Sequence, residues 1–276
     1  MASIPGVTEP TMLKSIRQFF ARQTSQAAAA VPAGERVYAI GDVHGRLDLF
    51  ETLAAAIEAD DAARGLAETT VILLGDLIDR GPDSAGVVAA TRDWQSRRKV
   101  RVICGNHEEK LLESFDDPAV LRGFLLYGGD ATIQSYGVAP ADLATADLAG
   151  TQALMRRAIP SEDLAFIAGF EDFVALGDYL FVHAGIRPGV PIGTQTVEDM
   201  RWIREPFLDY ADSHGFMVVH GHTITAEPDL RRNRIGIDTG AYKSGRLTAL
   251  GLEGERRWLI ATEERDGAIV VDTRPV

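Results

Sequence analysis

Short apolar runs recur along the chain and alternate with segments whose apolar residues have helical spacing. The runs are rich in β-branched residues, which is typical of buried strands, and they cover residues 37–41, 70–75, 100–105, 179–183 and 216–221. After the first run the apolar positions follow a helical period, and Gly65 marks the predicted end of that helix. Alternation of this kind predicts parallel strands joined by crossover helices, which is the α/β class of fold.

The pattern becomes helical after Gly105. Residues 108–175 are interrupted by Gly128-Gly129 and Pro140 but otherwise have helical spacing. The candidate core positions of this segment are Leu111, Leu112, Phe115, Leu121, Phe124 and Leu125. We therefore expect a helical insertion between two strands of the sheet.

Four further apolar runs fill the C-terminal third of the chain, at residues 234–240, 246–252, 256–262 and 268–273. The separators between them are short and turn-like. Short separators favour antiparallel hairpins, so we expect the chain to end in a series of hairpins.

The first 35 residues differ from the rest. Residues 11–23 carry apolar side chains at helical spacing with basic residues between them, and a stretch of small residues with Pro32 and Gly34 follows. We predict an N-terminal helix and linker over 1–35 and one main domain over 36–276. Amphipathic helices mostly serve packing, so we favour a docking helix over a membrane-surface helix.

Composition narrows the classes of function. The chain has 276 residues, a formal net charge of −12 and a sequence pI near 5.0. A nucleic-acid binder that neutralises phosphates needs a basic surface, so we expect no nucleic-acid partner. No apolar run approaches the roughly 20 residues of a membrane span. The single cysteine, Cys104, excludes an intrachain disulfide and favours a reducing compartment, so we expect a cytoplasmic protein.

A polar cluster follows each of the five predicted buried strands. The clusters are Gly41–Gly45, Gly75–Gly81, Gly105–Glu108, His183–Gly185 and His220–Thr223. Ligands of α/β proteins bind at the carboxyl ends of the strands, so we expect these clusters to converge. Their Asp and His donors suit Mn²⁺, Fe or Zn²⁺.

Two metal sites that share Asp76 account for these donors. The first would use Asp42, His44 and Asp76, and the second would use Asp76, Asn106, His183 and His222. One carboxylate oxygen of Asp76, shared between the two metals, would hold them roughly 3.5–4 Å apart, which is the spacing of two-metal hydrolysis. Asp79 and His107 would then remain free for acid–base work.

The motifs GDVHG, GDLIDRG, GNHE, HAG and GHT, in this order and spacing, resemble those of the calcineurin-like metallophosphoesterases. Within that family they look most like the phosphoprotein-phosphatase branch, especially its bacterial and phage members. The resemblance runs from about Val37 to about Tyr242. It implies a four-layer α/β/β/α sandwich, two divalent metal ions between its sheets, and hydrolysis of a phosphate monoester without a phosphoenzyme intermediate.

The resemblance also implies roles for single residues. The implied metal ligands are Asp42, His44, Asp76, Asn106, His183 and His222. His107 matches the general acid, Asp79 the carboxylate that orients it, and Arg80 a phosphate-clamping arginine. Arg204 resembles a second clamp, and Tyr242 resembles a tyrosine near the substrate groove. The expected metal is Mn²⁺, with Fe or Zn²⁺ as alternatives, because ligand type does not select among them.

Two alternatives stay open at this stage. His220 precedes His222 by two positions and is either a metal contact or, as we prefer, a strand residue with a packing role. The predicted substrate is a phosphoprotein, cleaved at phosphoserine or phosphothreonine. The alternative is a dinucleoside polyphosphate such as diadenosine tetraphosphate, and the wall formed by 108–175 would choose between them. The complete ligand set argues against a non-catalytic scaffold.

Overall fold

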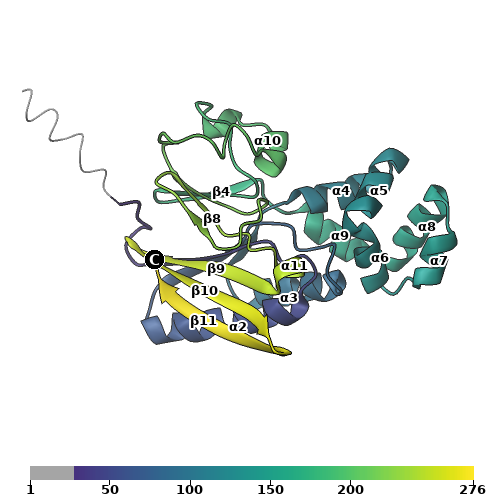
Figure 1. The fold of residues 1–276 in the computed structure, drawn as a ribbon, viewed down its shortest axis with the longest axis horizontal. Coiled ribbons are helices and arrows are strands. Elements are labelled where there is room, and N and C mark those ends of the chain that lie inside the picture. Colours follow the sequence, from purple (N-terminus) through teal and green to yellow (C-terminus); the bar gives the residue numbers. More distant parts are fainter. Residues whose placement is uncertain (1–27) are drawn as a thin grey trace, which may run out of the picture.

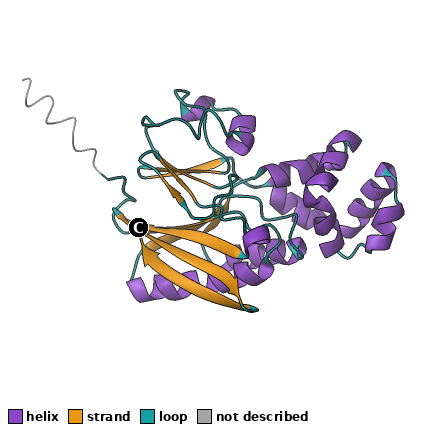
Figure 2. Ribbon diagram, in the orientation of Figure 1, coloured by secondary structure: helices purple, strands orange, loops and turns teal. Residues whose placement is uncertain are grey.

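A computed structural model describes residues 28–276 and contains two β-sheets with helices outside both (Figures 1 and 2). The six-stranded sheet has the order β11-β10-β9-β1-β2-β3 and the five-stranded sheet the order β4-β5-β6-β8-β7. The strands of the first sheet are β1 (Glu35–Ile40), β2 (Glu68–Leu73), β3 (Val100–Val102), β9 (Arg246–Glu253), β10 (Arg256–Arg265) and β11 (Ala268–Pro275). Those of the second are β4 (Phe173–Leu176), β5 (Tyr179–Val182), β6 (Met217–His220), β7 (Asp229–Leu230) and β8 (Arg234–Gly236).

Each sheet contains three neighbouring parallel strands, which form one half of the first sheet and the centre of the second. Strands β1, β2 and β3 run parallel, as do β5, β6 and β8. Helices α2 (Leu47–Arg64) and α3 (Ser84–Arg97) connect the first three strands, which confirms the predicted crossovers. Carboxyl ends of parallel strands gather at one edge of a sheet, so both sheets bring their strand-end turns to the same region.

Alternate residues of β1 face different layers. Val37 and Ala39 lie in the apolar cluster between the two sheets, whereas Tyr38 and Ile40 pack with the residues of α2 and α3. A third cluster lies on the outer side of the second sheet and includes Met200 of α10 (Val197–Trp202). The order of layers is therefore helix, sheet, sheet, helix, which confirms the predicted four-layer sandwich.

The C-terminal strands only partly follow the predicted hairpins. Strands β9, β10 and β11 pair antiparallel in sequence order, as expected. The run 234–240 does not join them: β8 ends at Gly236 and belongs to the second sheet, parallel to β6. The chain then crosses to the first sheet through α11 (Ala241–Ser244), a helical turn between Gly240 and Gly245, which both have positive φ. The short separator thus forms a crossing between sheets instead of a hairpin turn.

A group of helices lies between β3 and β4 and projects to one side of the sandwich (Figure 1). Its members are α4 (Asn106–Ser114), α5 (Pro118–Phe124), the π-helical turn η1 (Leu125–Gly129), α6 (Asp130–Ser135), α7 (Pro140–Thr145), α8 (Leu148–Ala158) and α9 (Ser161–Ala168). The helices thus begin two residues before the predicted 108 and end at Ala168. Strand β4 occupies residues 173–176, so most of it falls within the stretch predicted as helical. Of the predicted core positions, Leu112 and Leu125 are only partly buried.

The predicted N-terminal helix over 11–23 lies outside the described residues. The end of the predicted linker packs against the domain, since Val31 is buried between the sheets and its N–H donates to Gly254 O at 3.0 Å. No helix within residues 28–276 combines the length and the apolar character needed to cross a membrane.

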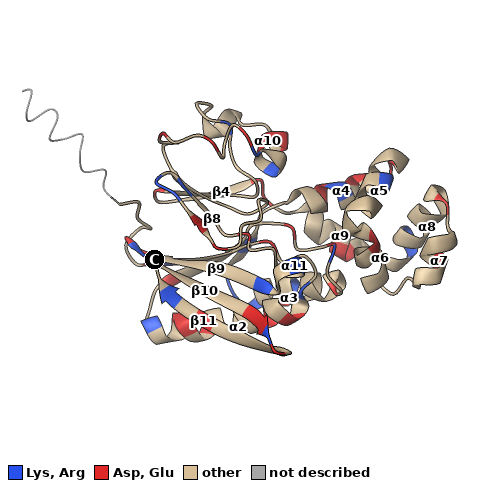
Figure 3. Cartoon of the chain, in the orientation of Figure 1, with Lys and Arg blue, Asp and Glu red and all other residues tan. Residues whose placement is uncertain are grey.

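Charges of both signs are interspersed on the surface helices, for example on α10 (Figure 3).

Candidate functional site

The strand-end turns share an uncommon backbone conformation. Six non-glycine residues of 28–276 have φ in the left-handed region, and five of them are predicted site residues: His44, Asp76, Asp79, Arg80 and His222. The sixth, Asp266, lies in the turn between β10 and β11. Left-handed φ in non-glycine residues costs energy and clusters at functional sites. The structure therefore concentrates its backbone strain on the predicted site.

Two motif glycines let carboxylates approach the backbone closely. A Cβ at Gly105 would lie 2.1 Å from Asp76 Oδ1, and one at Gly221 would lie 2.0 Å from Asp42 Oδ1. Any side chain at either position would displace the carboxylate. These glycines are thus required by close packing inside the site.

Asp76 lies at the centre of the converging side chains. Its Oδ2 is 3.6 Å from His44 Nε2, and its Oδ1 is 3.5 Å from His183 Nε2. Two groups of possible ligand atoms, each within 4.8 Å of one another, contain it: His44, Asp76 and His107, and Asp76, His183 and His222. Each carboxylate oxygen therefore faces a different group of possible ligand atoms, and Asp76 belongs to both groups.

The histidines present lone pairs to this centre. Nδ1 of His44 donates to Ile78 O and Nδ1 of His183 donates to Leu74 O, both at 2.8 Å. Burial lowers the pKa of His183 to about 4, so that its imidazole is neutral and Nε2 carries a lone pair. Nε2 of His222 is buried without a hydrogen-bond partner. Fixing one ring nitrogen by a carbonyl is how proteins orient metal-binding histidines.

Two contacts place electron-rich atoms together. Asn106 Oδ1 lies 3.0 Å from His183 Nε2, so two acceptors face each other. Asp42 accepts from the backbone N–H of His222 at 3.0 Å, and burial, with Asp238 and Asp76 nearby, raises its pKa well above the usual value. Buried acceptors and carboxylates in such proximity are costly without a cation. The donor set therefore fits divalent metal ions.

Arg80 already brings one cation to these lone pairs. Its guanidinium donates to His44 Nε2 at 2.8 Å and to His107 Nε2 at 2.9 Å. Its backbone N–H donates to Gly128 O at 3.0 Å, which ties its turn to η1. Tyr242 packs behind it, with the guanidinium carbon 4.7 Å from the centre of the phenol ring.

His107 and Asp79 form a buried pair. Nδ1 of His107 lies 2.6 Å from Asp79 Oδ2, so that the carboxylate fixes the tautomer and the orientation of the ring. Thr132 Oγ1 donates to Asp79 Oδ1 at 2.5 Å from helix α6. Burial raises the pKa of Asp79 well above its usual value, and the Thr132 hydrogen bond opposes that rise.

Three further buried residues support the site, and none of them was predicted to do so. Glu108 accepts from the N–H groups of Asp76, Leu77 and Gly105 at 2.8–2.9 Å, and burial raises its pKa to about 7. A glutamate at the third position of a helix is a capping pattern that could have revealed it. Asp238 lies beside Asp42, and burial raises its pKa to about 6. The third is Thr132, for which no local pattern exists, because it acts on a residue 53 positions away.

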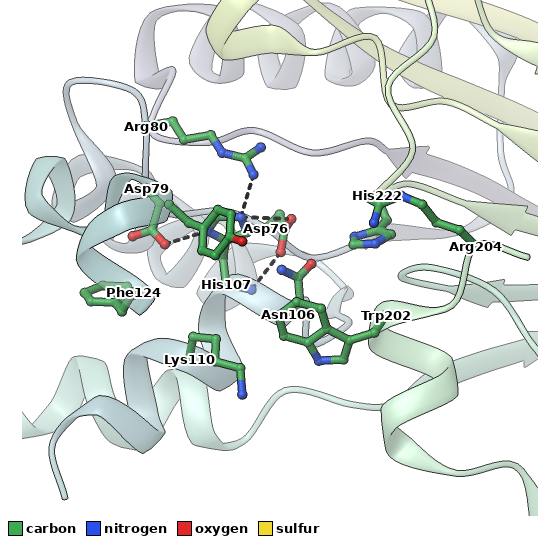
Figure 4. A pocket seen from close by; sticks show the side chains of 11 residues that line it. Asp76, Asp79, Arg80, Asn106, His107, Lys110, Phe124, Trp202, Arg204 and His222 are labelled. Carbon is green, nitrogen blue, oxygen red and sulfur yellow. Dashed lines mark hydrogen bonds and ion pairs between the residues drawn. The ribbon is translucent and has the colours of Figure 1, made fainter. Parts of the chain in front are cut away.

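A cleft opens beside this cluster (Figure 4). It comprises about 620 Å³ of space, part of which is open to solvent. Besides residues of the cluster, its lining includes Arg204, Lys110, Trp202, Phe124 and Tyr127. Arg204 is exposed and, among residues 28–276, has no acidic partner, so its charge is available to a ligand.

The remaining candidates lie outside the cleft lining. Tyr242 contacts the His44 ring at 5.2 Å between centroids and packs against Arg80, but it does not line the cleft. His220 packs its ring against Phe207, and its Nδ1 contacts Gly221 O, so it is no member of the two ligand groups. Cys104 is buried, and burial raises the pKa of its thiol. The structure thus gathers Asp76, its ligand groups, His107, Arg80 and Arg204 in one place.

Comparisons with known proteins all point to phosphoester- or phosphoanhydride-hydrolysing relatives. A family model of the calcineurin-like phosphoesterases matches residues 35–234. A zinc-dependent endopolyphosphatase of Saccharomyces cerevisiae is 26% identical over 249 residues, covering 76% of this chain and 74% of the relative. An asymmetrical bis(5'-nucleosyl)-tetraphosphatase of Anoxybacillus flavithermus is 27% identical over 234 residues, covering 76% and 88%.

Solved structures show the same fold. A structure provisionally assigned to a diadenosine tetraphosphatase has a TM-score of 0.58 at 19% identity and covers 90% of this chain and 98% of its own. A variant of a cold-active protein tyrosine phosphatase has a TM-score of 0.53 at 19% identity, with coverage of 88% and 83%. At these identities the likeness concerns the fold and not the substrate.

Proposed function

The chain belongs to the calcineurin-like phosphoesterase family, and from that premise we propose that it hydrolyses phosphoanhydride bonds of dinucleoside polyphosphates. The observation that carries the proposal is the composition of the cleft. Beyond Arg80 it offers two more cationic side chains, Arg204 and Lys110, together with the aromatic Trp202 and Tyr127. A chain of phosphates uses several cations, and a base uses an aromatic wall.

The names of the relatives support the same choice. The yeast relative is named for polyphosphate and the bacterial relative for bis(5'-nucleosyl) tetraphosphate, and both substrates are phosphoanhydrides. The motifs alone favoured a phosphoprotein phosphatase. We therefore place the dinucleotide, which was the alternative, ahead of the phosphoprotein.

We assign the metal ions to the converging side chains. Asp42, His44 and Asp76 would hold the first, and Asp76, Asn106, His183 and His222 would hold the second. When bound, two divalent cations supply Lewis-acid activation of a water molecule and of the phosphate. Mn²⁺ stays a prediction, and the zinc dependence in the name of the yeast relative makes Zn²⁺ the first alternative to test. A cytoplasmic location also stays a prediction.

The protein side chains would bind, orient and supply a proton. Arg80 and Arg204 would grip phosphate oxygens in a bidentate manner, for which a planar guanidinium is suited. Arg80 would leave Nε2 of His107 to do so. Nε2 of His107, which accepts from Arg80 in the structure, would then take up a proton from solvent and pass it to the leaving oxygen, while Asp79 keeps its hold on Nδ1 and stabilises the imidazolium.

A paired substrate assay tests the proposal. Purified protein with Mn²⁺ receives diadenosine tetraphosphate and a phosphoserine peptide in parallel, with Asp76→Asn as the blank for contaminating activity. We expect kcat/KM for the dinucleotide to be about 10-fold higher or more, equivalent to about 1.4 kcal/mol of extra transition-state binding. Faster hydrolysis of the peptide would refute the proposal and restore the phosphoprotein phosphatase.

A further inference from the structure

We propose that Trp202 is the stacking platform for a nucleobase of the substrate, and that Glu109 is the positioning residue that orients it. The proposal rests on the proposed function, because it assigns one part of the cleft to the nucleoside. Trp202 is the last residue of α10 and lies in the wall of the cleft, close to Asn106 and Lys110 in Figure 4.

The three tryptophans of the chain provide an internal comparison. Each donates its indole N–H to a carboxylate: Trp94 to Glu58 at 2.7 Å, Trp258 to Asp60 at 2.9 Å and Trp202 to Glu109 at 2.6 Å. Trp94 and Trp258 are only 3% exposed and belong to the apolar core. Trp202 is half-buried and faces the cleft instead.

The satisfied indole N–H limits what Trp202 can offer a ligand. Its polar atom is already bonded to Glu109, so the open part of the side chain is the apolar ring. A flat apolar surface recognises a flat partner, and every nucleobase has such a face. The chemistry of the exposed part therefore fits stacking and not hydrogen-bonded recognition of one base.

Glu109 fixes the ring from a separate helix. It lies on α4 and accepts from both Trp202 and Arg201, whose guanidinium lies 3.1 Å from Glu109 Oε1. Arg201 also donates to Asp172 at 2.7 Å. This network ties the end of α10 to the helix that begins at Asn106, so the ring is held at a set position relative to the metal-ligand cluster.

The neighbours of the ring complete a path for the phosphate chain. Lys110 Nζ is 5.3 Å from the centre of the Trp202 ring, and Arg204 follows Trp202 by two residues. The His222 ring centre is 6.4 Å from that of Trp202, and the two ring planes are 75° apart. A base on Trp202 would thus leave its phosphates between these cations and the Asp76 cluster.

Two substitutions of similar volume separate stacking from general packing. Trp202→Phe keeps an aromatic face, whereas Trp202→Leu keeps only apolar bulk. Each variant, loaded with Mn²⁺, receives diadenosine tetraphosphate and inorganic tripolyphosphate, which has the same bond but no base. We expect Trp202→Leu to lower kcat/KM for the dinucleotide about 10-fold more than for tripolyphosphate, mainly through KM, and Trp202→Phe to retain most of the preference. An equal loss on both substrates in Trp202→Leu would overturn the platform.

Variants of Glu109 test the positioning role. Glu109→Gln keeps an oxygen that accepts from the indole N–H, and Glu109→Ala removes it. We expect Glu109→Ala to raise KM for the dinucleotide more than for tripolyphosphate and Glu109→Gln to restore it. Equal effects of both variants on both substrates would show that Glu109 has no positioning role toward the base.

Fluorescence keeps this test apart from the test of the proposed function. Adenosine diphosphate should quench the tryptophan emission of the wild-type protein, and the quenching should disappear in Trp202→Phe, since Trp94 and Trp258 are buried. A wild-type protein that cleaves tripolyphosphate but not the dinucleotide would refute the proposed function. Quenching that persists in Trp202→Phe would refute the platform, whatever the substrate proves to be.

Discussion

The cleft has two parts, which hold their side chains in different ways. We call the strand-end turns around Asp76 its floor, and the helices around it, from α4 to α6 together with α10, its wall. The floor consists of strand-end turns whose side chains are almost fully buried, such as Asp76 and His183 at 2% and 0% exposure. Their positions follow from left-handed turns and from glycines against carboxylates. In the wall, Trp202 and Lys110 are half-buried and are held by hydrogen bonds and ion pairs between side chains. The floor suits chemistry that must stay constant, and the wall suits recognition that can vary.

Besides the bond from Arg80 N–H to Gly128 O, one hydroxyl group links the two regions. Thr132 belongs to α6 in the wall, yet its Oγ1 bonds Asp79 in the floor and also accepts the Asp79 N–H at 2.9 Å. The wall therefore supports the acid–base pair in addition to lining the cleft. Substitutions in the floor, at Thr132 and outside the site should therefore have effects that differ in magnitude and in the property they change.

The largest effect is expected in the floor, from Asp76→Asn. An amide loses the negative charge shared by both ligand groups, so both metals should bind weakly and activity should fall by more than the roughly 100-fold that loss of an outer partner causes. Metal analysis together with turnover checks this. Asp266→Asn is the matched control, because Asp266 has the same left-handed backbone in a remote turn. Full activity with two metals in Asp76→Asn would contradict the bridging role.

His107→Asn should come next and should depend on the leaving group. General acid catalysis contributes roughly 10²–10⁴-fold. An alkoxide is more basic than a phosphate oxyanion and needs the proton more, so the loss should be larger for a phosphoserine peptide than for a dinucleotide. Steady-state kinetics on both substrates and metal analysis provide the readouts. Loss of metal along with activity would contradict a pure acid role.

Thr132→Val tests the junction and should lower kcat about 10-fold, in the range seen for loss of outer partners. The variant removes a hydrogen bond that holds down the pKa of Asp79, and Asp79 must be ionised to orient His107. The acid limb of the pH–rate profile should therefore move to higher pH. Thr132→Ser keeps the hydroxyl and should behave as the wild type. An unchanged profile in Thr132→Val would mean that the wall only lines the cleft.

The smallest effect on activity is expected from Asp61→Asn, far from both regions. Asp61 pairs with the buried Arg36 at 2.6 Å. Burial works to raise the pKa of Asp61, but hydrogen bonds from Arg98, Thr69 and Arg36 outweigh it and hold that pKa below its usual value.

The ionised form of Asp61 is thus favoured in the folded state. Its contribution, about 2 kcal/mol for a charged hydrogen bond, is present above the unfolded pKa of about 3.9 and is lost as pH falls through the lower folded value. Thermal melts should show a lower Tm for the variant at pH 7 and a smaller difference near pH 3. The same difference in Tm at both pH values would show that the ionised carboxylate of Asp61 is not the source of the stabilisation.

Local patterns were enough to locate most of the floor. Each predicted metal ligand lies within a few residues of an apolar strand, and parallel strands bring their carboxyl ends together by geometry. The sequence favoured the histidine at 222 over the one at 220, because it follows a glycine and precedes Thr223 as in the phosphatase branch. In the structure, His222 has a left-handed φ and His220 does not. Local sequence patterns were therefore sufficient to predict the candidate site residues that lie at strand ends.

Tertiary contacts decided the rest. Thr132 reaches Asp79 across 53 residues, and Glu109 reaches Trp202 across 93, so no local pattern reports either contact. The crossing from β8 to β9 was also missed, because its separator is as short as that of a hairpin. By itself the sequence determined the α/β class and placed the candidate ligands at the strand ends, since these depend on neighbours along the chain. The wall and the hydrogen bonds that hold its side chains form only when helices distant in the sequence pack together.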